Sequence, residues 1–173
     1  MAELYGWRLC PRCGADLIVG DGQMRCDTCG SRYFANSAPT VGALCGDEQG
    51  RLLLVRRAID PEKGKWDTPG GFLAEGEHPL DGLRRELLEE TGLEIEPVEF
   101  LGAWTDSYGD ALNAQAILSL NWIARVSGGT ARAADDVCEL RWFAPDELPA
   151  RGELAFRSVA DVVEAWRARA ERS

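Results

Sequence analysis

Four cysteines near the start of the chain limit how this segment can fold. They form two pairs of equal spacing, Cys10 with Cys13 and Cys26 with Cys29, with twelve residues between the pairs. Each C-x-x-C turn can direct two thiolates to one point, and two such turns complete a tetrahedron around Zn²⁺. A segment this short needs a metal to fold, because it cannot build a sufficient core. We therefore expect a zinc ribbon over residues 1–35, the alternative being four unrelated buried cysteines.

The charge of the chain bears on its partners. Residues 1–35 hold four arginines and four acidic residues, and four thiolates on one Zn²⁺ would add a charge of about −2. This balance gives the ribbon no electrostatic footprint for a polyanion. The formal net charge of the whole chain is −10, which disfavours a general affinity for nucleic acid or an anionic membrane. We expect the ribbon to have a structural or dimerising role.

The sequence indicates a cytoplasmic protein. No apolar run approaches the roughly 20 residues that cross a bilayer. The opening letters MAELYGWRLC contain an early glutamate and no apolar signal-peptide core. Thiols stay reduced in the cytoplasm, so we interpret the two remaining cysteines, Cys45 and Cys138, as structural residues of strands.

Residues 36–173 are expected to form a second domain of the α/β class. TVGALCG (40–46) and RLLLVRR (51–57) are β-rich runs on either side of a turn at residues 47–50, which predicts a hairpin. Further strands are predicted at 100–106, 116–126 and 138–143. An apolar stripe at residues 156, 159, 163 and 166 predicts a C-terminal helix. Strands before, between and after two helices indicate a mixed sheet covered on both faces.

A charge-rich helix is predicted from Pro79 to the stop at Thr91-Gly92, because proline is favoured in a first helical turn and glycine after a last one. Its leucines Leu80, Leu83 and Leu87 form a stripe that can pack under the sheet.

Three glutamates of this helix share another face. Glu86, Glu89 and Glu90 stand at i, i+3 and i+4, where like charges destabilise a helix by roughly a few tenths of a kcal/mol per pair. A cation reverses that sign, and clustered carboxylate oxygens suit Mg²⁺ or Mn²⁺, which bind substrate phosphates. The alternative is a solvated acidic face, the usual meaning of such a run.

The loop before the helix favours the metal interpretation. Gly70 and Gly71 let the backbone approach a metal closely and offer it a carbonyl. Glu77 adds a carboxylate, and Arg85 can orient a neighbouring glutamate through a charge-assisted hydrogen bond.

These residues match a family pattern. Gly71, five residues, Glu77, seven residues and then the run RELLEETGL from Arg85 to Leu93 fit the Nudix box, G-x5-E-x7-R-E-U-x-E-E-x-G-U, at every specified position. A chance match has a frequency on the order of one in 10⁹ per starting position. The chain resembles the Nudix hydrolases over roughly residues 38–150, and its G-x-W-x-x-P-G-G stretch, ending at Gly71, is also similar to many members.

The resemblance implies an α/β/α sandwich that cleaves a nucleoside diphosphate linked to another group, with Mg²⁺ or Mn²⁺ bound by the box. Glu86 and Glu90 would be the principal ligands of that metal, assisted by Glu89, Glu77 and the Gly71 carbonyl. The chemistry agrees, because divalent ions neutralise phosphate oxygens and activate water.

The general base varies in position within the family. We take Glu89 and Glu139 as candidates beside the metal ligand Glu90, with Asp136 in the same acidic loop as Glu139; a solvated loop is the alternative. His78, the only histidine, is interpreted as an exposed residue at the helix start.

Substrate contacts are expected from two groups of side chains. Arg56 and Arg57 end a strand that leads to the site and would meet the distal phosphate or ribose. Trp104, Tyr108 and Phe72 would stack on a nucleobase or else pack in the core.

A zinc ribbon before a Nudix domain resembles the NADH pyrophosphatases, but their S-Q-P-W-P-F-P-x-S array is absent from residues 94–115. The compact layout and the segment at residues 153–158 are closer to short zinc-ribbon Nudix proteins that act on FAD and ADP-ribose. We therefore expect a Mg²⁺-dependent pyrophosphatase that acts on ADP-ribose or FAD and releases AMP plus a phosphorylated partner.

Two alternatives stay open. One is an NADH or NAD pyrophosphatase, and the other is a nucleotide-sensing or nucleic-acid-associated regulator on the same scaffold. The expected partner is a small nucleotide, with no nucleic acid and no membrane, and the resemblance implies a homodimer.

Overall fold

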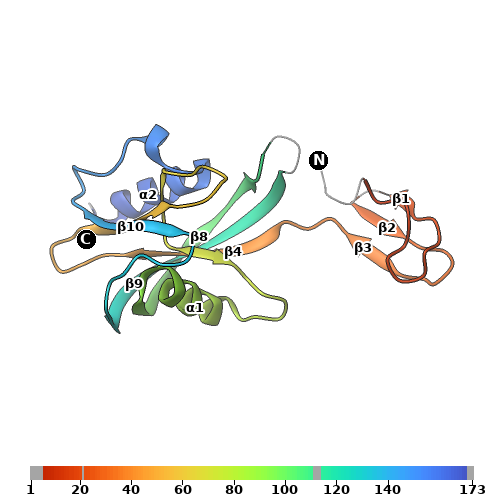
Figure 1. The fold of residues 1–173 in the computed structure, drawn as a ribbon, viewed down its shortest axis with the longest axis horizontal. Helices are drawn as coiled ribbons and strands as arrows, with labels where there is room; N and C mark the ends of the chain where they lie inside the picture. The colour runs from red at the N-terminus through yellow and green to blue at the C-terminus, as the bar shows by residue number, and fades with distance from the viewer. Residues whose placement is uncertain (1–5, 21, 111–113, 171–173) are drawn as a thin grey trace.

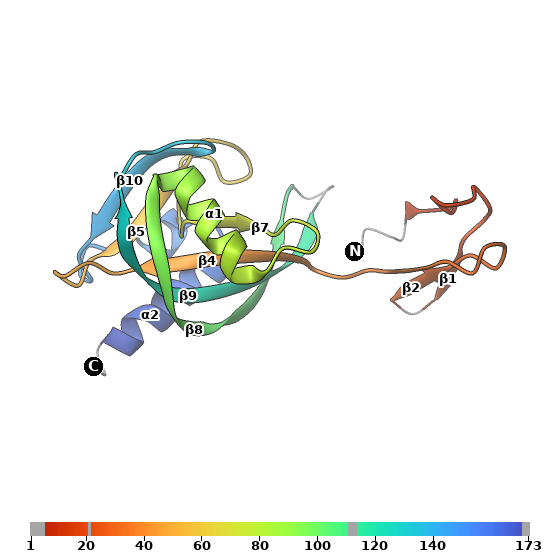
Figure 2. The ribbon, with the colours of Figure 1, turned by 90° about the horizontal axis from the view of Figure 1, so that it is seen from below.

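A computed structural model describes residues 6–20, 22–110 and 114–170. Its N-terminal part is an antiparallel sheet of β1 (Ile18–Gly20), β2 (Gln23–Arg25) and β3 (Arg32–Phe34) in the order β1-β2-β3. In Figures 1 and 2 this small sheet stands apart from the rest of the fold, joined to it by the chain between β3 and β4. The change of structure falls where the sequence predicts the end of the ribbon.

The larger part of the fold is built on a four-stranded mixed sheet. Its strands are β7 (Gly70–Phe72), β4 (Ala38–Cys45), β9 (Gln115–Gly129) and β8 (Leu93–Tyr108), in that order. The two central strands, β4 and β9, are parallel, with Ala38 opposite Ile117, and the other neighbours are antiparallel. This confirms the predicted mixed sheet.

A second, antiparallel sheet holds the remaining strands. Its order is β10 (Val137–Phe143), β5 (Leu52–Arg57) and β6 (Trp66–Asp67). The prediction that β4 and β5 pair as a hairpin is therefore wrong. The two strands lie in different sheets, and one bridge between Gly46 and Leu52 joins them next to the turn. The physical reason is that β7 and β9 already occupy both edges of β4, which leaves no edge for β5.

Two helices cover the sheets, as the sequence predicts. α1 (Pro79–Thr91) begins at the N-cap His78 and ends at the C-cap Gly92. α2 (Arg157–Ala170) follows the short 3₁₀ helix η2 (Arg151–Glu153). The two helices lie on opposite sides of the β-structure in Figures 1 and 2, which is the α/β/α arrangement expected from the resemblance.

Side chains alternate between two cores along the central strands. On β4, Ala43 and Cys45 pack in the core with Leu83 and Leu87 of α1, whereas Leu44 packs in the core that includes residues of α2. The period of two is the expected pattern for strands covered on both faces. Leu83 and Leu87 of the predicted leucine stripe are thus confirmed as the packing face of α1, whereas Leu80 is only half-buried and lies outside this core.

The two strand cysteines differ in burial. Cys45 is fully buried, as predicted, whereas Cys138 is exposed. The structural interpretation of Cys138 as a core residue is wrong, because its place on β10 turns the side chain outward; its thiol lies 3.4 Å from the carbonyl oxygen of Arg56. Among the helices formed by the described residues, none is long and apolar enough to cross a membrane.

Candidate active site

Arg85 donates hydrogen bonds to Glu77, Glu86 and Glu89, which together with Glu90 form the carboxylate cluster. Its Nε and one Nη each donate to a carboxylate oxygen of Glu77 at 2.8 Å. The other Nη donates to Glu86 at 2.7 Å and to Glu89 at 3.1 Å. The guanidinium also donates to the carbonyl of Phe72 at 3.2 Å, so it ties the end of β7 to the acidic face of α1. The expected orienting role of Arg85 agrees with this geometry.

Glu90 lies on the buried side of the cluster. It is 6% exposed, and its carboxylate accepts a hydrogen bond of 2.8 Å from the backbone N–H of Gly70. A Cβ at Gly70 would lie 2.1 Å from the carbonyl oxygen of Val41, so glycine is required where β7 meets β4. The sequence pair Gly70-Gly71 therefore places backbone and carboxylates side by side.

Gly71 faces Glu86. A Cβ added at Gly71 would lie 2.5 Å from a carboxylate oxygen of Glu86. The missing side chain thus leaves the space in which that carboxylate sits, against the backbone of β7. Gly71, Glu86 and Glu90 are brought together as the sequence predicts for metal ligands.

The loop between β9 and β10 packs against the C-terminal end of α1. The backbone N–H groups of Arg132 and Ala134 donate to the carbonyls of Thr91 and Glu90, at 2.8 Å and 3.0 Å. These bonds satisfy carbonyls at the end of α1 that have no partner within the helix. The loop then delivers Asp136 to the same region, where its charge acts on Glu90.

The pKa values of the glutamates show which carboxylates have their negative charge compensated by neighbouring groups and which do not. Hydrogen bonds from Arg85, and then from the Ala74 N–H, lower the pKa of Glu77 to about 2. Burial raises the pKa of Glu86, and burial with the charges of Asp136, Asp67 and Glu86 raises that of Glu90 well above its ordinary value. A divalent cation would offset this excess charge.

The donor set fits Mg²⁺ or Mn²⁺. Both are hard cations that take carboxylate and carbonyl oxygens, and those are the groups gathered between β7 and α1. Glu86 and Glu90 have the carboxylates with raised pKa values and would hold the ion most directly. Glu77 has both oxygens engaged by Arg85 and would contribute by holding that arginine in place.

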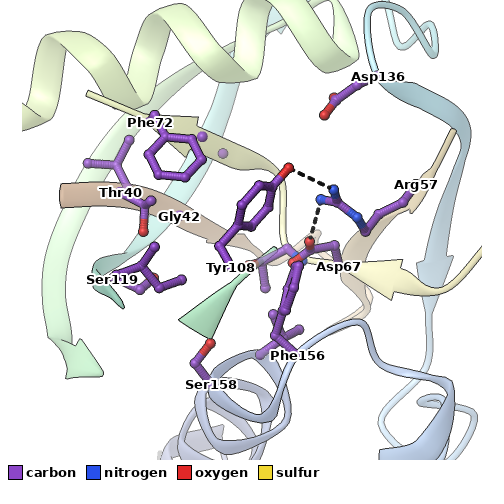
Figure 3. Close-up of a pocket in the computed structure, with 16 residues that line it drawn as sticks. Thr40, Gly42, Arg57, Asp67, Phe72, Tyr108, Ser119, Asp136, Phe156 and Ser158 are labelled. Carbon is purple, nitrogen blue, oxygen red and sulfur yellow. Dashed lines mark hydrogen bonds and ion pairs between the residues drawn. The ribbon is translucent and has the colours of Figure 1, made fainter. Parts of the chain in front are cut away.

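A pocket opens beside this cluster, shown in Figure 3. Its empty space is about 580 Å³, a volume that includes open solvent at its mouth. Its wall includes the backbone of β7 at Gly70 and Gly71, the aromatic rings and a set of polar side chains. The aromatic residues are Phe72, Tyr108 and Phe156, and the polar ones are Thr40, Arg57, Asp67, Thr68, Ser119, Asp136 and Ser158.

The residues predicted to touch substrate separate into two groups. Arg57, Tyr108 and Phe72 line the pocket, and their contact with substrate stays a prediction. Arg56 is exposed and pairs with Glu139 at 3.2 Å, outside the lining residues.

The remaining candidates also lie elsewhere. Trp104 packs against the core on the α2 side, which agrees with the packing alternative, and Glu139 points to Arg56 instead of the pocket. His78 caps α1 by accepting from the N–H of Leu80 at 3.3 Å, as expected for a residue at the helix start.

Asp67, Phe156 and Ser158 are among the lining residues for which the sequence predicted no contact with substrate. Asp67 stands within the G-x-W-x-x-P-G-G stretch, and an acid on a short strand before two glycines was a usable signal. Phe156 fitted the apolar stripe of α2 and so was assigned to packing. Ser158 enters the pocket because Asp106 accepts a 2.7 Å hydrogen bond from its backbone N–H, a contact without a sequence signal.

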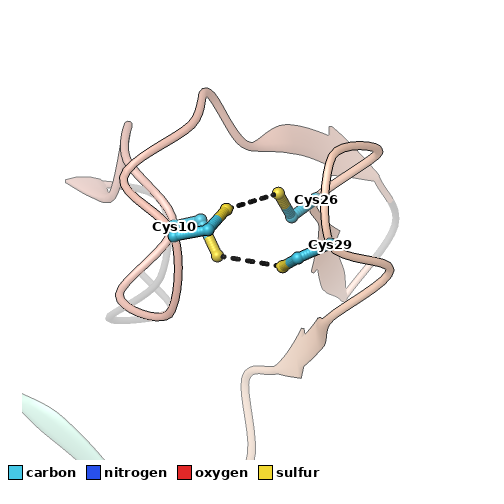
Figure 4. A group of neighbouring side chains, drawn as sticks. Cys10, Cys26 and Cys29 are labelled. Atoms are coloured by element: carbon cyan, nitrogen blue, oxygen red, sulfur yellow. Dashed lines mark hydrogen bonds between the residues drawn. The ribbon is translucent and has the colours of Figure 1, made fainter.

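The four cysteines of the ribbon converge, as Figure 4 shows for the cluster. Their sulfur atoms all lie within 4.8 Å of one another, with Cys10 and Cys29 at 3.7 Å and Cys13 and Cys26 at 3.5 Å. Zn–S bonds of about 2.3 Å in a tetrahedron place sulfurs roughly 3.8 Å apart. The cluster could therefore hold zinc.

The two cysteine turns have the same construction. Gly14 donates to the carbonyl of Cys10, and Gly30 donates to that of Cys26, both at 2.8 Å. Both glycines have positive φ, +72° and +73°, which an L side chain adopts at a cost. The repeated turn follows from the repeated C-x-x-C-G letters.

A mixed sheet between two helices, with clustered carboxylates on one helix and a pocket beside them, defines the class of enzymes that hydrolyse phosphoanhydrides. A family model described as the NUDIX domain matches residues 36–162. The chain therefore belongs to the Nudix family, and it is a Nudix pyrophosphatase. Enzymes of this family generally use Mg²⁺ or Mn²⁺ and act on small nucleotides.

Individual relatives agree with this assignment. An ADP-ribose pyrophosphatase of Methanocaldococcus jannaschii is 34% identical over 72% of this chain and 70% of its own length. The NAD-capped RNA hydrolase NudC of Stutzerimonas stutzeri is 28% identical over 83% of this chain. The match spans 50% of the length of that protein. A solved Nudix hydrolase of Nitrosomonas europaea matches with a TM-score of 0.76 at 25% identity, covering 96% of this chain and 94% of that one.

Replacement of Gly71 by alanine is expected to weaken the affinity for Mg²⁺ about tenfold while the fold persists. The new methyl group would take the place of the Glu86 carboxylate, and displaced metal ligands or their supports cost on the order of 10- to 100-fold. The Mg²⁺ dependence of turnover measures this effect. Gly152→Ala, where a Cβ meets nothing within 4 Å, is the control, and an unchanged Mg²⁺ requirement in Gly71→Ala would contradict the assignment of Gly71.

Proposed function

We propose that this enzyme hydrolyses the diphosphate of ADP-ribose or of FAD-like dinucleotides with Mg²⁺, releasing AMP plus the phosphorylated partner. The observation that supports it most is the position of Glu86 and Glu90 against Gly70 and Gly71, at the edge of a pocket with aromatic rings. The diphosphate would lie at the carboxylates and the nucleoside in the pocket. The similarity to an ADP-ribose pyrophosphatase over most of both chains supports the substrate class.

In this proposal each side chain has a defined task. Mg²⁺, when bound, supplies charge for the phosphate oxygens and lowers the pKa of a water molecule. Glu86 and Glu90 hold the cation, while Arg85 keeps Glu77, Glu86 and Glu89 in position through its hydrogen bonds. The acidic site excludes the anionic diphosphate until the cation is present.

The general base is proposed to be Glu89 or Asp136. Glu89 is exposed, and Arg85 bonds only one of its two carboxylate oxygens. Glu89 can therefore accept a proton from water. Asp136 lines the pocket, where Figure 3 shows its side chain. Glu139, the other candidate from the sequence, is paired with Arg56 away from the pocket, and we no longer favour it.

The ribbon is proposed to hold one structural Zn²⁺ on Cys10, Cys13, Cys26 and Cys29. The sulfur spacing supports this. The buried cysteines Cys10 and Cys26 would be shielded from solvent by the turns around them.

A second candidate is the hydrolysis of NAD(H) or of an NAD cap. The similarity to NudC favours it, since the match covers 83% of this chain. The absent S-Q-P-W-P-F-P-x-S array counts against it.

One substrate panel separates these candidates. We expect Mg²⁺-dependent release of AMP from ADP-ribose or FAD at a kcat/KM at least about tenfold above that for NADH. The panel should also contain an NAD-capped RNA oligonucleotide, a diadenosine polyphosphate and a nucleoside triphosphate, with product identity read by chromatography. Preference for NADH or capped RNA would favour the second candidate, and no Mg²⁺-dependent turnover of any compound would refute both.

A further inference from the structure

The guanidinium of Arg57 forms a hydrogen bond from each of its three nitrogens within the pocket wall. Its Nε donates to the carbonyl of Pro61 at 2.8 Å, one Nη donates to Asp67 at 3.2 Å, and the other donates to the hydroxyl of Tyr108 at 3.2 Å. The residue is only 9% exposed. These bonds and the burial hold the guanidinium in one orientation within the pocket wall.

The same guanidinium packs against two neighbouring aromatic rings whose centres lie 5.6 Å apart. Its Cζ lies 5.7 Å from the ring centre of Tyr108 and 5.2 Å from that of Phe156. On Tyr108, the ring of Phe72 packs edge to face, with centres 5.2 Å apart at 87°. Arg57 thus joins rings from β8, from the segment before α2 and, through Tyr108, from β7. Figure 3 shows these groups side by side.

The charge of the lining does not suit an anion. Among the described residues that line the pocket, Arg57 alone is basic, and Asp67 and Asp136 are acidic. Asp67 neutralises Arg57 in a pair whose side chains are 10% and 13% exposed. The remaining surface is aromatic and hydroxyl-bearing, which matches a neutral planar ring system better than a phosphate.

We propose that Arg57 is a positioning residue that fixes the ring of Tyr108 in the binding surface for the nucleobase, and that it does not bind phosphate. This rests on the proposed function for its substrate, because a nucleoside diphosphate derivative has one neutral base and one anionic group. The base lies in the pocket, and the diphosphate lies at the carboxylates beside Gly71. The expectation drawn from the sequence was that Arg57 meets the distal phosphate or the ribose, and this proposal replaces it.

The test uses two probes that separate base from phosphate. Adenosine has no phosphate, and inorganic pyrophosphate has no base. In Arg57→Lys the charge beside Asp67 remains, but one ammonium group cannot bond Pro61, Asp67 and Tyr108 together. We expect the affinity for adenosine to fall at least about fivefold, the lower range for a lost base–aromatic stack. The affinity for pyrophosphate with Mg²⁺ should change less than about twofold.

Two further variants keep the test valid if Arg57→Lys folds poorly. Tyr108→Phe removes only the hydroxyl that Arg57 bonds, and Tyr108→Leu removes the ring. We expect adenosine affinity to fall in both, more in Tyr108→Leu, and the KM for ADP-ribose to rise while kcat stays within about threefold. Arg141→Lys is the control, because Arg141 is an exposed arginine that stacks on Phe143 at 4.6 Å, away from the pocket.

The outcomes are distinct for this inference and for the proposed function. Unchanged adenosine affinity with weaker pyrophosphate binding in Arg57→Lys would make Arg57 a phosphate ligand and overturn the inference. Failure of the folded parent enzyme to bind adenosine while it hydrolyses ADP-ribose would also overturn it. If adenosine binding depends on Arg57 but ADP-ribose is not hydrolysed, the inference stands and the proposed substrate is wrong. Calorimetry or ligand-observed NMR measures both affinities directly.

Discussion

Glu90→Gln is expected to lower Mg²⁺-dependent hydrolysis by at least about 100-fold. Glutamine retains an oxygen that can accept the hydrogen bond from the Gly70 N–H, so the change removes charge and little else. Supporting residues around a metal alone cost on the order of 10- to 100-fold, and a direct ligand should cost more. The measurement is kcat/KM on the best compound of the substrate panel at saturating Mg²⁺.

Two controls define this result. Glu96→Gln removes an exposed carboxylate that pairs with Arg125 and should leave turnover unchanged.

Without divalent ions, Glu90→Gln should melt at a higher temperature than the parent at pH 8, and the difference should vanish near pH 4. The sign follows because burial raises the folded-state pKa of Glu90 above its unfolded value. That raised pKa costs stability once the pH exceeds the unfolded value. A loss of activity below about tenfold would contradict the assignment of Glu90 as a ligand.

Cys26→Ser is expected to abolish zinc binding and to unfold the ribbon. Cys26 is 1% exposed and lies 3.5 Å from the sulfur of Cys13, so serine cannot complete the tetrathiolate. Structural zinc supplies an apparent free energy of about 10–16 kcal/mol to small domains at pH 7. The zinc content of purified protein should fall from about one ion per chain to none. Limited proteolysis should then cut within residues 6–34 and spare residues 38–170.

The exposed Cys138 provides the matched control for this change. Cys138→Ser alters a thiol of the larger part of the fold and should leave both zinc content and proteolysis unchanged. A parent protein without zinc, or a Cys26→Ser variant that resists proteolysis as the parent does, would refute the zinc assignment.

Local patterns made much of the fold predictable. The first-turn residue Pro79 and the C-cap Gly92 set the bounds of α1 correctly, because helix ends depend on a few neighbouring residues. The stripe of Leu83 and Leu87 identified the packed face for the same reason. Strand partners were harder, since the turn after β4 looks like a hairpin turn, and only the whole sheet shows that both edges of β4 are taken.

The site was predictable where its residues follow one another in the chain. Glu86, Glu90 and Gly71 belong to one loop and helix, so spacing placed them together. The pocket was not predictable in the same way, because Arg57, Tyr108 and Phe156 come from three separate segments. Arg57 looked like a free cation in the sequence, and its neutralisation by Asp67 depends on the pairing of β5 with β6.

The parallel pairing of β4 with β9 has a consequence for the order in which the chain folds. Ala38 lies opposite Ile117, so the centre of the main sheet joins segments nearly eighty residues apart in the chain. Such distant pairing is slow, because a long loop must close before the contacts form. Within the described residues, the ribbon strands pair with their sequence neighbours. During synthesis on the ribosome we expect the ribbon to fold first. The apolar residues of β4 stay exposed to solvent until β9 has been synthesised.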